Sequence, residues 1–83
     1  MIFNVNEIIE LSGGKKHIIV DYTLYNDQYY YYVCEVNKEE TNALPVFKVI
    51  TTVNENGSLF VKTIKDDLEK MLINVFKSKN ITE

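Results

Sequence analysis

The segment 28–36 reads QYYYYVCEV and places four tyrosines in a row within a run typical of a β-strand. Successive side chains of a strand point to opposite faces of its sheet, so this strand carries large side chains on both faces. A single hydrophobic core lies on one side of a sheet and therefore buries only one of those faces. The chain must therefore either cover both faces of its sheet or leave tyrosine rings on the surface.

Turn signals divide the chain into strands with short connections. Gly13-Gly14 permit positive φ, and Asn26-Asp27 and Asn56-Gly57 are typical of tight turns. Between these signals, β-branched and aromatic residues predict five strands. The expected strands span residues 6–11, 15–25, 28–36, 46–53 and 58–64. Pro45 has no amide hydrogen to donate, so it marks the start or an edge of the fourth strand.

The hydrophobic period then changes from two to that of a helix. Asp66 suits the N-cap position, and Glu69 three residues later completes a capping box. Apolar residues follow with helical spacing, at Leu68, Met71, Leu72, Val75 and Phe76. These signals predict a helix over residues 66–78, in one domain that spans residues 1–78. We expect residues 79–83 to form a flexible tail.

The element order predicts a mainly β (α+β) fold of five antiparallel strands with one C-terminal helix. Five strands joined by short turns form either an open, curled sheet with the helix on one face or an SH3-like barrel. The pattern leaves both alternatives open.

Composition restricts the function classes. Nine lysines, no arginine and twelve acidic residues give a net charge of −3. These values argue against nucleic acid as a partner, because binding the phosphate backbone relies on clustered positive charge. No apolar run reaches the roughly 20 residues of a membrane helix. The single cysteine and the absence of a secretory signal in residues 1–7 lead us to expect a cytoplasmic protein.

The tight turn at Asn26-Asp27 predicts which face each tyrosine occupies. It sets Tyr25 opposite Gln28, and the alternation then turns Tyr29, Tyr31 and Val33 toward the core. The same register places Ile18, Val20, Tyr22 and Leu24 on the core face of the second strand. Outward-facing residues then form an aromatic and aliphatic surface, which we name the tyrosine patch. Its members are Ile19, Tyr25, Tyr30 and Tyr32.

Catalytic, cofactor and metal-binding residues are not predicted. His17 and Cys34 are the one histidine and the one cysteine, and a nucleophilic pair needs them within hydrogen-bond reach. The expected register sets His17 opposite Val36 and Cys34 opposite Ile19, so the two do not face each other. The scattered carboxylates lack zinc-ligand spacing. The turn Ser12–Lys15 lacks the frame of a phosphate-binding loop.

The first 37 residues resemble short uncharacterised proteins of low-GC Gram-positive bacteria and their mobile elements. The matching positions are Val5, Glu7, Ile8, Ile9, Glu10, Leu11, Gly14, Lys15, Lys16 and residues 18–21. This resemblance implies an SH3-like barrel or a curled β-sheet domain, and it implies no activity.

These observations predict a non-enzymatic interaction module that binds a protein or peptide partner, or forms a homodimer, through the tyrosine patch. The alternative for that patch is burial beneath the C-terminal helix by Leu68, Leu72 and Phe76.

A second functional hypothesis is a mobile-element inhibitor that occupies the nucleic-acid groove of a host enzyme with an acidic surface. That surface comprises Glu7, Glu10, Asp21, Glu39, Glu40 and Glu55. A third hypothesis is a hydrolase built on His17.

Overall fold

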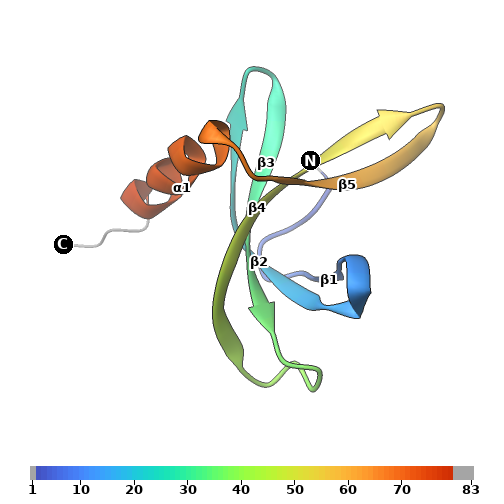
Figure 1. The fold of residues 1–83 in the computed structure, drawn as a ribbon, viewed down its shortest axis with the longest axis vertical. Helices are drawn as coiled ribbons and strands as arrows, with labels where there is room; N and C mark the ends of the chain where they lie inside the picture. Colours follow the sequence, from blue (N-terminus) through green and yellow to red (C-terminus); the bar gives the residue numbers. More distant parts are fainter. Residues whose placement is uncertain (1, 80–83) are drawn as a thin grey trace.

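The computed structural model of the chain describes residues 2–79, in which five strands precede one helix (Figure 1). The strands are β1 (Ile8–Glu10), β2 (Lys16–Tyr25), β3 (Gln28–Val36), β4 (Ala43–Glu55) and β5 (Ser58–Ile64). A 3₁₀ turn, η1 (Ser12–Gly14), joins β1 to β2, and the helix α1 spans Asp67–Lys79. The strands pair in chain order and antiparallel throughout.

The sheet is a curled half-barrel, which is the open alternative of the two that the sequence predicts. Strands β1 and β5 form its two edges. Two tight hairpins fix the pairing of β2 with β3 and of β4 with β5. Asn26 and Asp27 have φ of 50° and 62°, and Asn56 and Gly57 have φ of 52° and 83°. Positive φ at both central residues matches the right-handed twist of the flanking strands, so both predicted turns are confirmed.

Strand β4 is longer than the sequence predicts, because it begins at Ala43 instead of residue 46 and ends at Glu55 instead of residue 53. Its partner β5 reaches only as far as Ile64, which lies opposite Val49. Residues 43–48 therefore pair with β3 alone and form a local edge. Pro45 lies in this edge segment, where it offers no N–H to an incoming strand.

A β-bulge in β2 overturns part of the predicted register. From Tyr25 opposite Gln28 to Asp21 opposite Tyr32, the pairing is as predicted. The register then shifts between Ile19 and Asp21, so that Ile19 lies opposite Val33 and His17 opposite Glu35. One extra residue, Val20, reverses the alternation of every residue before it. Ile19 therefore belongs to the core, whereas Val20, predicted to face the core, is exposed.

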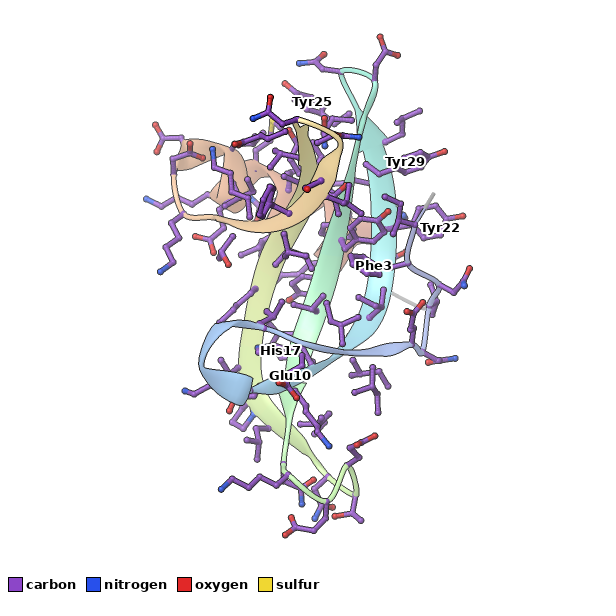
Figure 2. The ribbon with its side chains drawn as sticks, turned by 90° about the vertical axis from the view of Figure 1, so that its right-hand side faces the viewer. Phe3, Glu10, His17, Tyr22, Tyr25 and Tyr29 are labelled. Carbon is purple, nitrogen blue, oxygen red and sulfur yellow. The ribbon has the colours of Figure 1, made fainter. Side chains whose placement is uncertain are left out.

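Both faces of the sheet are covered, each by a different part of the chain. On the helix face, α1 packs Leu72 and Phe76 against Tyr32, Val49 and Ile64. On the opposite face, the segment that precedes β2 brings apolar side chains onto a second core, so we name it the arm face. That core comprises Ile19, Tyr31, Val33 and Ile50, with Phe3, Ile9, Leu11, Tyr22 and Tyr29 packed against it. Figure 2 shows Phe3, Tyr22 and Tyr29 gathered on one side of the sheet.

The tyrosines divide between the two faces as the turn register predicts. Tyr29 and Tyr31 pack on the arm face, and Tyr30 and Tyr32 pack on the helix face. The Tyr31 ring meets Phe3 edge-on at 5.1 Å between centroids, and its hydroxyl accepts a hydrogen bond from the Ile2 amide at 3.2 Å. Burial of the helix face beneath α1, the alternative in the sequence analysis, is therefore what the structure shows.

The helix α1 is held at both ends. The Asp66 carboxylate accepts a hydrogen bond from the Leu68 amide at 3.0 Å, which confirms Asp66 as the N-cap. At the other end, Lys79 Nζ donates to the Tyr22 carbonyl oxygen at 2.7 Å and lies 3.3 Å from an Asp21 carboxylate oxygen. The sequence predicts that Lys79 lies in the flexible tail. That prediction is wrong, because Lys79 is the last residue of α1. Residues 80–83 of that tail lie outside the described residues.

We predict that Tyr32→Ser destabilises the fold by about 3–5 kcal/mol, because it removes a buried ring from the helix face. Tyr25→Ser, at an exposed ring, should cost less than about 1 kcal/mol. Urea denaturation followed by circular dichroism measures both, with Tyr32→Phe as a control that keeps the ring. Similar losses for the two serine variants would contradict the burial of Tyr32.

Candidate interaction surface

The predicted tyrosine patch does not exist as one surface. Ile19 is 0% exposed and lies on the arm face, and Tyr32 is 8% exposed beneath α1. Tyr30 is half-buried against the helix-face core. Only Tyr25 is clearly exposed, at 38%, and its ring lies 6.4 Å from that of Tyr30. The expected exposure of Ile19 is wrong because of the bulge, and that of Tyr32 is wrong because α1 covers it.

The two residues considered for nucleophilic chemistry lie on opposite faces of the sheet. Cys34 pairs with Ile18, whereas His17 pairs with Glu35, the next residue along β3. Adjacent positions alternate between faces, so the imidazole and the thiol point away from each other. The Cys34 thiol is buried and donates to the Leu44 carbonyl oxygen at 3.0 Å. Within residues 2–79, no three His, Cys, Asp or Glu side chains gather as a metal site.

His17 is fully buried on the arm-face side of β2, where the sequence predicts an outward-facing residue. Its Nδ1 lies 3.3 Å from the Lys15 carbonyl oxygen, and its Nε2 has no hydrogen-bond partner among the described residues. Burial lowers the pKa of the imidazole from its ordinary value, because the protein interior disfavours the charged form. His17 is therefore a neutral core residue at neutral pH.

Among the described residues, the longest run of consecutive exposed apolar side chains on one strand lies in β5. Leu59, Phe60 and Val61 are 49%, 51% and 43% exposed. The β4–β5 hairpin projects away from α1 (Figure 1). Because successive residues alternate, Leu59 and Val61 lie on one face and Phe60 on the other. We name Leu59, Phe60 and Val61 the β5 edge.

The backbone of β5 is also open on its outer side. Glu55 and Ser58 close the two-residue turn and exchange hydrogen bonds with each other, as in other hairpins of this type. In an antiparallel ladder the bonded and non-bonded pairs alternate from that point. The N–H and C=O groups of Leu59, Val61 and Thr63 therefore point away from β4, toward solvent. An edge strand with free backbone groups and apolar side chains is a template for another strand.

A cleft lies between the two edges of the half-barrel. Its volume is about 470 Å³, and its lining residues come from the end of β1, from β4 and from the second half of β5 and its continuation. These residues are Glu10, Leu11, Lys48, Val61, Thr63 and Lys65. Val61 thus belongs both to this cleft and to the β5 edge. β1 and β5 are not paired with each other, and this cleft lies between them.

A sequence signal for the β5 edge exists in the segment SLFVKTI. A strand with one buried face alternates between apolar and polar residues, whereas three successive apolar residues here give both faces apolar character. As the last strand of a meander, β5 has a neighbour on one side only. The three successive apolar residues and the position of the segment as the last strand can both be read from the sequence. The contact surface was instead predicted from the four tyrosines of β3.

No family model, no curated protein and no solved structure matches the chain. Among residues 2–79, no helix has the length and apolar character that crossing a membrane requires.

We predict that the free energy of unfolding decreases as the pH falls through the ordinary histidine pKa of about 6.5. Burial lowers the pKa of His17 in the folded state below its value in the unfolded chain. Between these two pKa values the unfolded chain binds more protons than the folded protein, so it gains stability relative to the folded state. Above that range the contribution is fully present. Urea denaturation between pH 5 and 8 measures the slope.

His17→Leu is the matched variant, because it retains an apolar volume and removes the only imidazole of the chain. Its stability should vary less over this pH range. An unchanged slope in His17→Leu would assign the pH dependence to other groups.

Proposed function

We propose that the chain is a small, non-enzymatic, cytoplasmic protein-interaction module and that its contact surface is the β5 edge. One observation carries this proposal: Leu59, Phe60 and Val61 are about half exposed in succession on a strand whose outer backbone groups are free. This surface replaces the tyrosine patch, of which Ile19 and Tyr32 are buried.

An edge strand binds by adding a strand to its sheet. Backbone hydrogen bonds supply a general part of the affinity, and side chains on the two faces supply specificity. The β5 edge presents Phe60 to one face and Leu59 with Val61 to the other. A protein or peptide partner in an extended conformation therefore contacts apolar side chains on both sides of the new strand.

The non-enzymatic part of the proposal is supported by the placement of His17 and Cys34. The two groups are buried on opposite faces of the sheet, so a substrate cannot reach both from one side. A hydrolase built on His17 alone requires an accessible imidazole, and this imidazole is 0% exposed.

Inhibition through an acidic surface has less support. Glu39 and Glu40 lie in the loop before β4, whereas Glu55 lies at the far end of that strand. Glu40 is 2.7 Å from Lys16 Nζ, and Asp21 is 3.3 Å from Lys79 Nζ, so lysines offset part of the negative charge. Groove mimicry predicts an affinity that falls steeply with salt, whereas apolar strand pairing predicts little change.

Photo-cross-linking in the cell of origin tests the proposal. A photoreactive phenylalanine analogue at residue 60 should give a discrete adduct, and the same analogue at Leu24 should not. Leu24 is the matched control because it is similarly exposed, at 56%, but lies on the β2–β3 hairpin.

Backbone pairing adds a second requirement, that the adduct at residue 60 disappears in Val61→Pro. Proline removes the outward N–H of Val61, and an edge strand tolerates proline where that N–H faces solvent. Adducts from residue 24 alone, or adducts that persist in Val61→Pro, would overturn the β5 edge as the contact surface.

A further inference from the structure

We propose that the strand that adds to β5 is β5 of a second copy of this chain, antiparallel, with the two-fold axis at Phe60. This inference rests on the proposed function and specifies its partner. The argument depends on the backbone, the apolar side chains and the charges of the β4–β5 hairpin.

The backbone groups permit the pairing. A two-fold axis perpendicular to the sheet at Phe60 sets Leu59 opposite Val61 of the second copy, and Val61 opposite its Leu59. These are the positions whose N–H and C=O groups point outward, so each of the two pairs exchanges both hydrogen bonds. Phe60 lies opposite Phe60 of the second copy as the non-bonded pair between them, where side chains approach more closely.

The apolar side chains are self-complementary about the same axis. On one face the two Phe60 rings become neighbours, and each already lies beside Val53 of its own β4. On the other face Leu59 and Val61 cover each other across the new ladder. The three exposed residues of each copy thus find apolar partners, and aromatic and aliphatic cross-strand pairs stabilise antiparallel sheets.

The charges select this register over its neighbours. Ser58 pairs with Glu55 inside the hairpin, and the Phe60-centred register sets Ser58 opposite Lys62 of the second copy. Glu55 and that lysine then lie on the same face, about 10 Å apart across a small serine, within reach of their long side chains. Two such ion pairs flank the Phe60 pair.

Other registers lose this complementarity. An axis at Lys62 sets the two Lys62 side chains opposite each other, which is unfavourable. With the axis at Val61, Lys62 lies opposite Phe60 of the second copy and is farther from that copy's Glu55. The proposed dimer joins one strand from each copy, so its interface is small and its association weak, as in transient complexes that bury less than about 1,200 Å².

A cysteine scan of β5 tests the register. In a Cys34→Ser background, single variants Leu59→Cys, Phe60→Cys and Val61→Cys are incubated at high concentration with oxidised glutathione and separated on a non-reducing gel. Only Phe60→Cys should form a disulfide-linked dimer, because its Cα–Cα distance to its own copy is about 4.5 Å.

The flanking positions are the matched controls. In the proposed register, Leu59 and Val61 each lie about 8 Å from the same residue of the second copy, beyond disulfide reach. A dimer from Val61→Cys alone would move the axis and overturn the register. No dimer from any variant would overturn pairing between copies.

Sedimentation velocity over a concentration series tests the charges independently of any cysteine. Glu55→Lys and Lys62→Glu should each weaken the dimer by about threefold to tenfold, and the double variant should restore it. Glu39→Lys makes the same charge change in the β3–β4 loop and should leave association unchanged. Equal weakening by Glu39→Lys, or no restoration in the double variant, would overturn the proposed ion pairs.

The photo-cross-linking experiment separates the two proposals. An adduct at residue 60 with twice the mass of the chain supports both of them. An adduct of another mass supports the β5 edge as a contact surface and overturns the second copy as its partner. The absence of any adduct at residue 60 contradicts both.

Discussion

The stack of the Tyr32 and Phe76 rings is the contact on which the rest of the structure depends. The ring planes are nearly parallel, at 8°, with centroids 5.0 Å apart, and the Phe47 ring also stacks on Tyr32, at 5.2 Å. This contact joins the helix to the middle of the sheet, where β3 carries apolar residues on both faces. α1 covers one of these faces, and the segment before β2 covers the other. Burial of the Tyr32 ring also raises the pKa of its phenol, so the group stays neutral.

The two cores that cover β3 do not include Leu59, Phe60 or Val61 of β5. The helix packs against Tyr32, Val49 and Ile64, and the arm-face core draws on residues 3–11. The β4–β5 hairpin extends beyond both cores, and its three apolar residues remain half exposed. The candidate interaction surface is therefore a part of the sheet that neither core covers.

Much of the fold follows from local signals. The tight turns at Asn26-Asp27 and Asn56-Gly57 fixed two hairpins, and the Asp66 cap placed the start of the helix within one residue. The bulge at Val20 has no such signal, because an extra residue in a strand of β-branched and aromatic side chains leaves the composition unchanged. That one residue moved Ile19 from the expected surface into the arm-face core. The exposure of Tyr32 was equally beyond local reasoning, since it depends on where α1 packs. For these two reasons the predicted tyrosine patch does not form one exposed surface.

Amide hydrogen exchange along β5, followed by NMR at low and high protein concentration, tests the account most directly. In dilute solution the amides of Leu59, Val61 and Thr63 should exchange fast, and those of Phe60 and Lys62 slowly, because only the latter bond to β4. At high concentration Leu59 and Val61 should become protected while Thr63, beyond the paired segment, stays fast. Protection of Leu59 and Val61 that is independent of concentration, or absent at both concentrations, would contradict an open edge that pairs with its own copy.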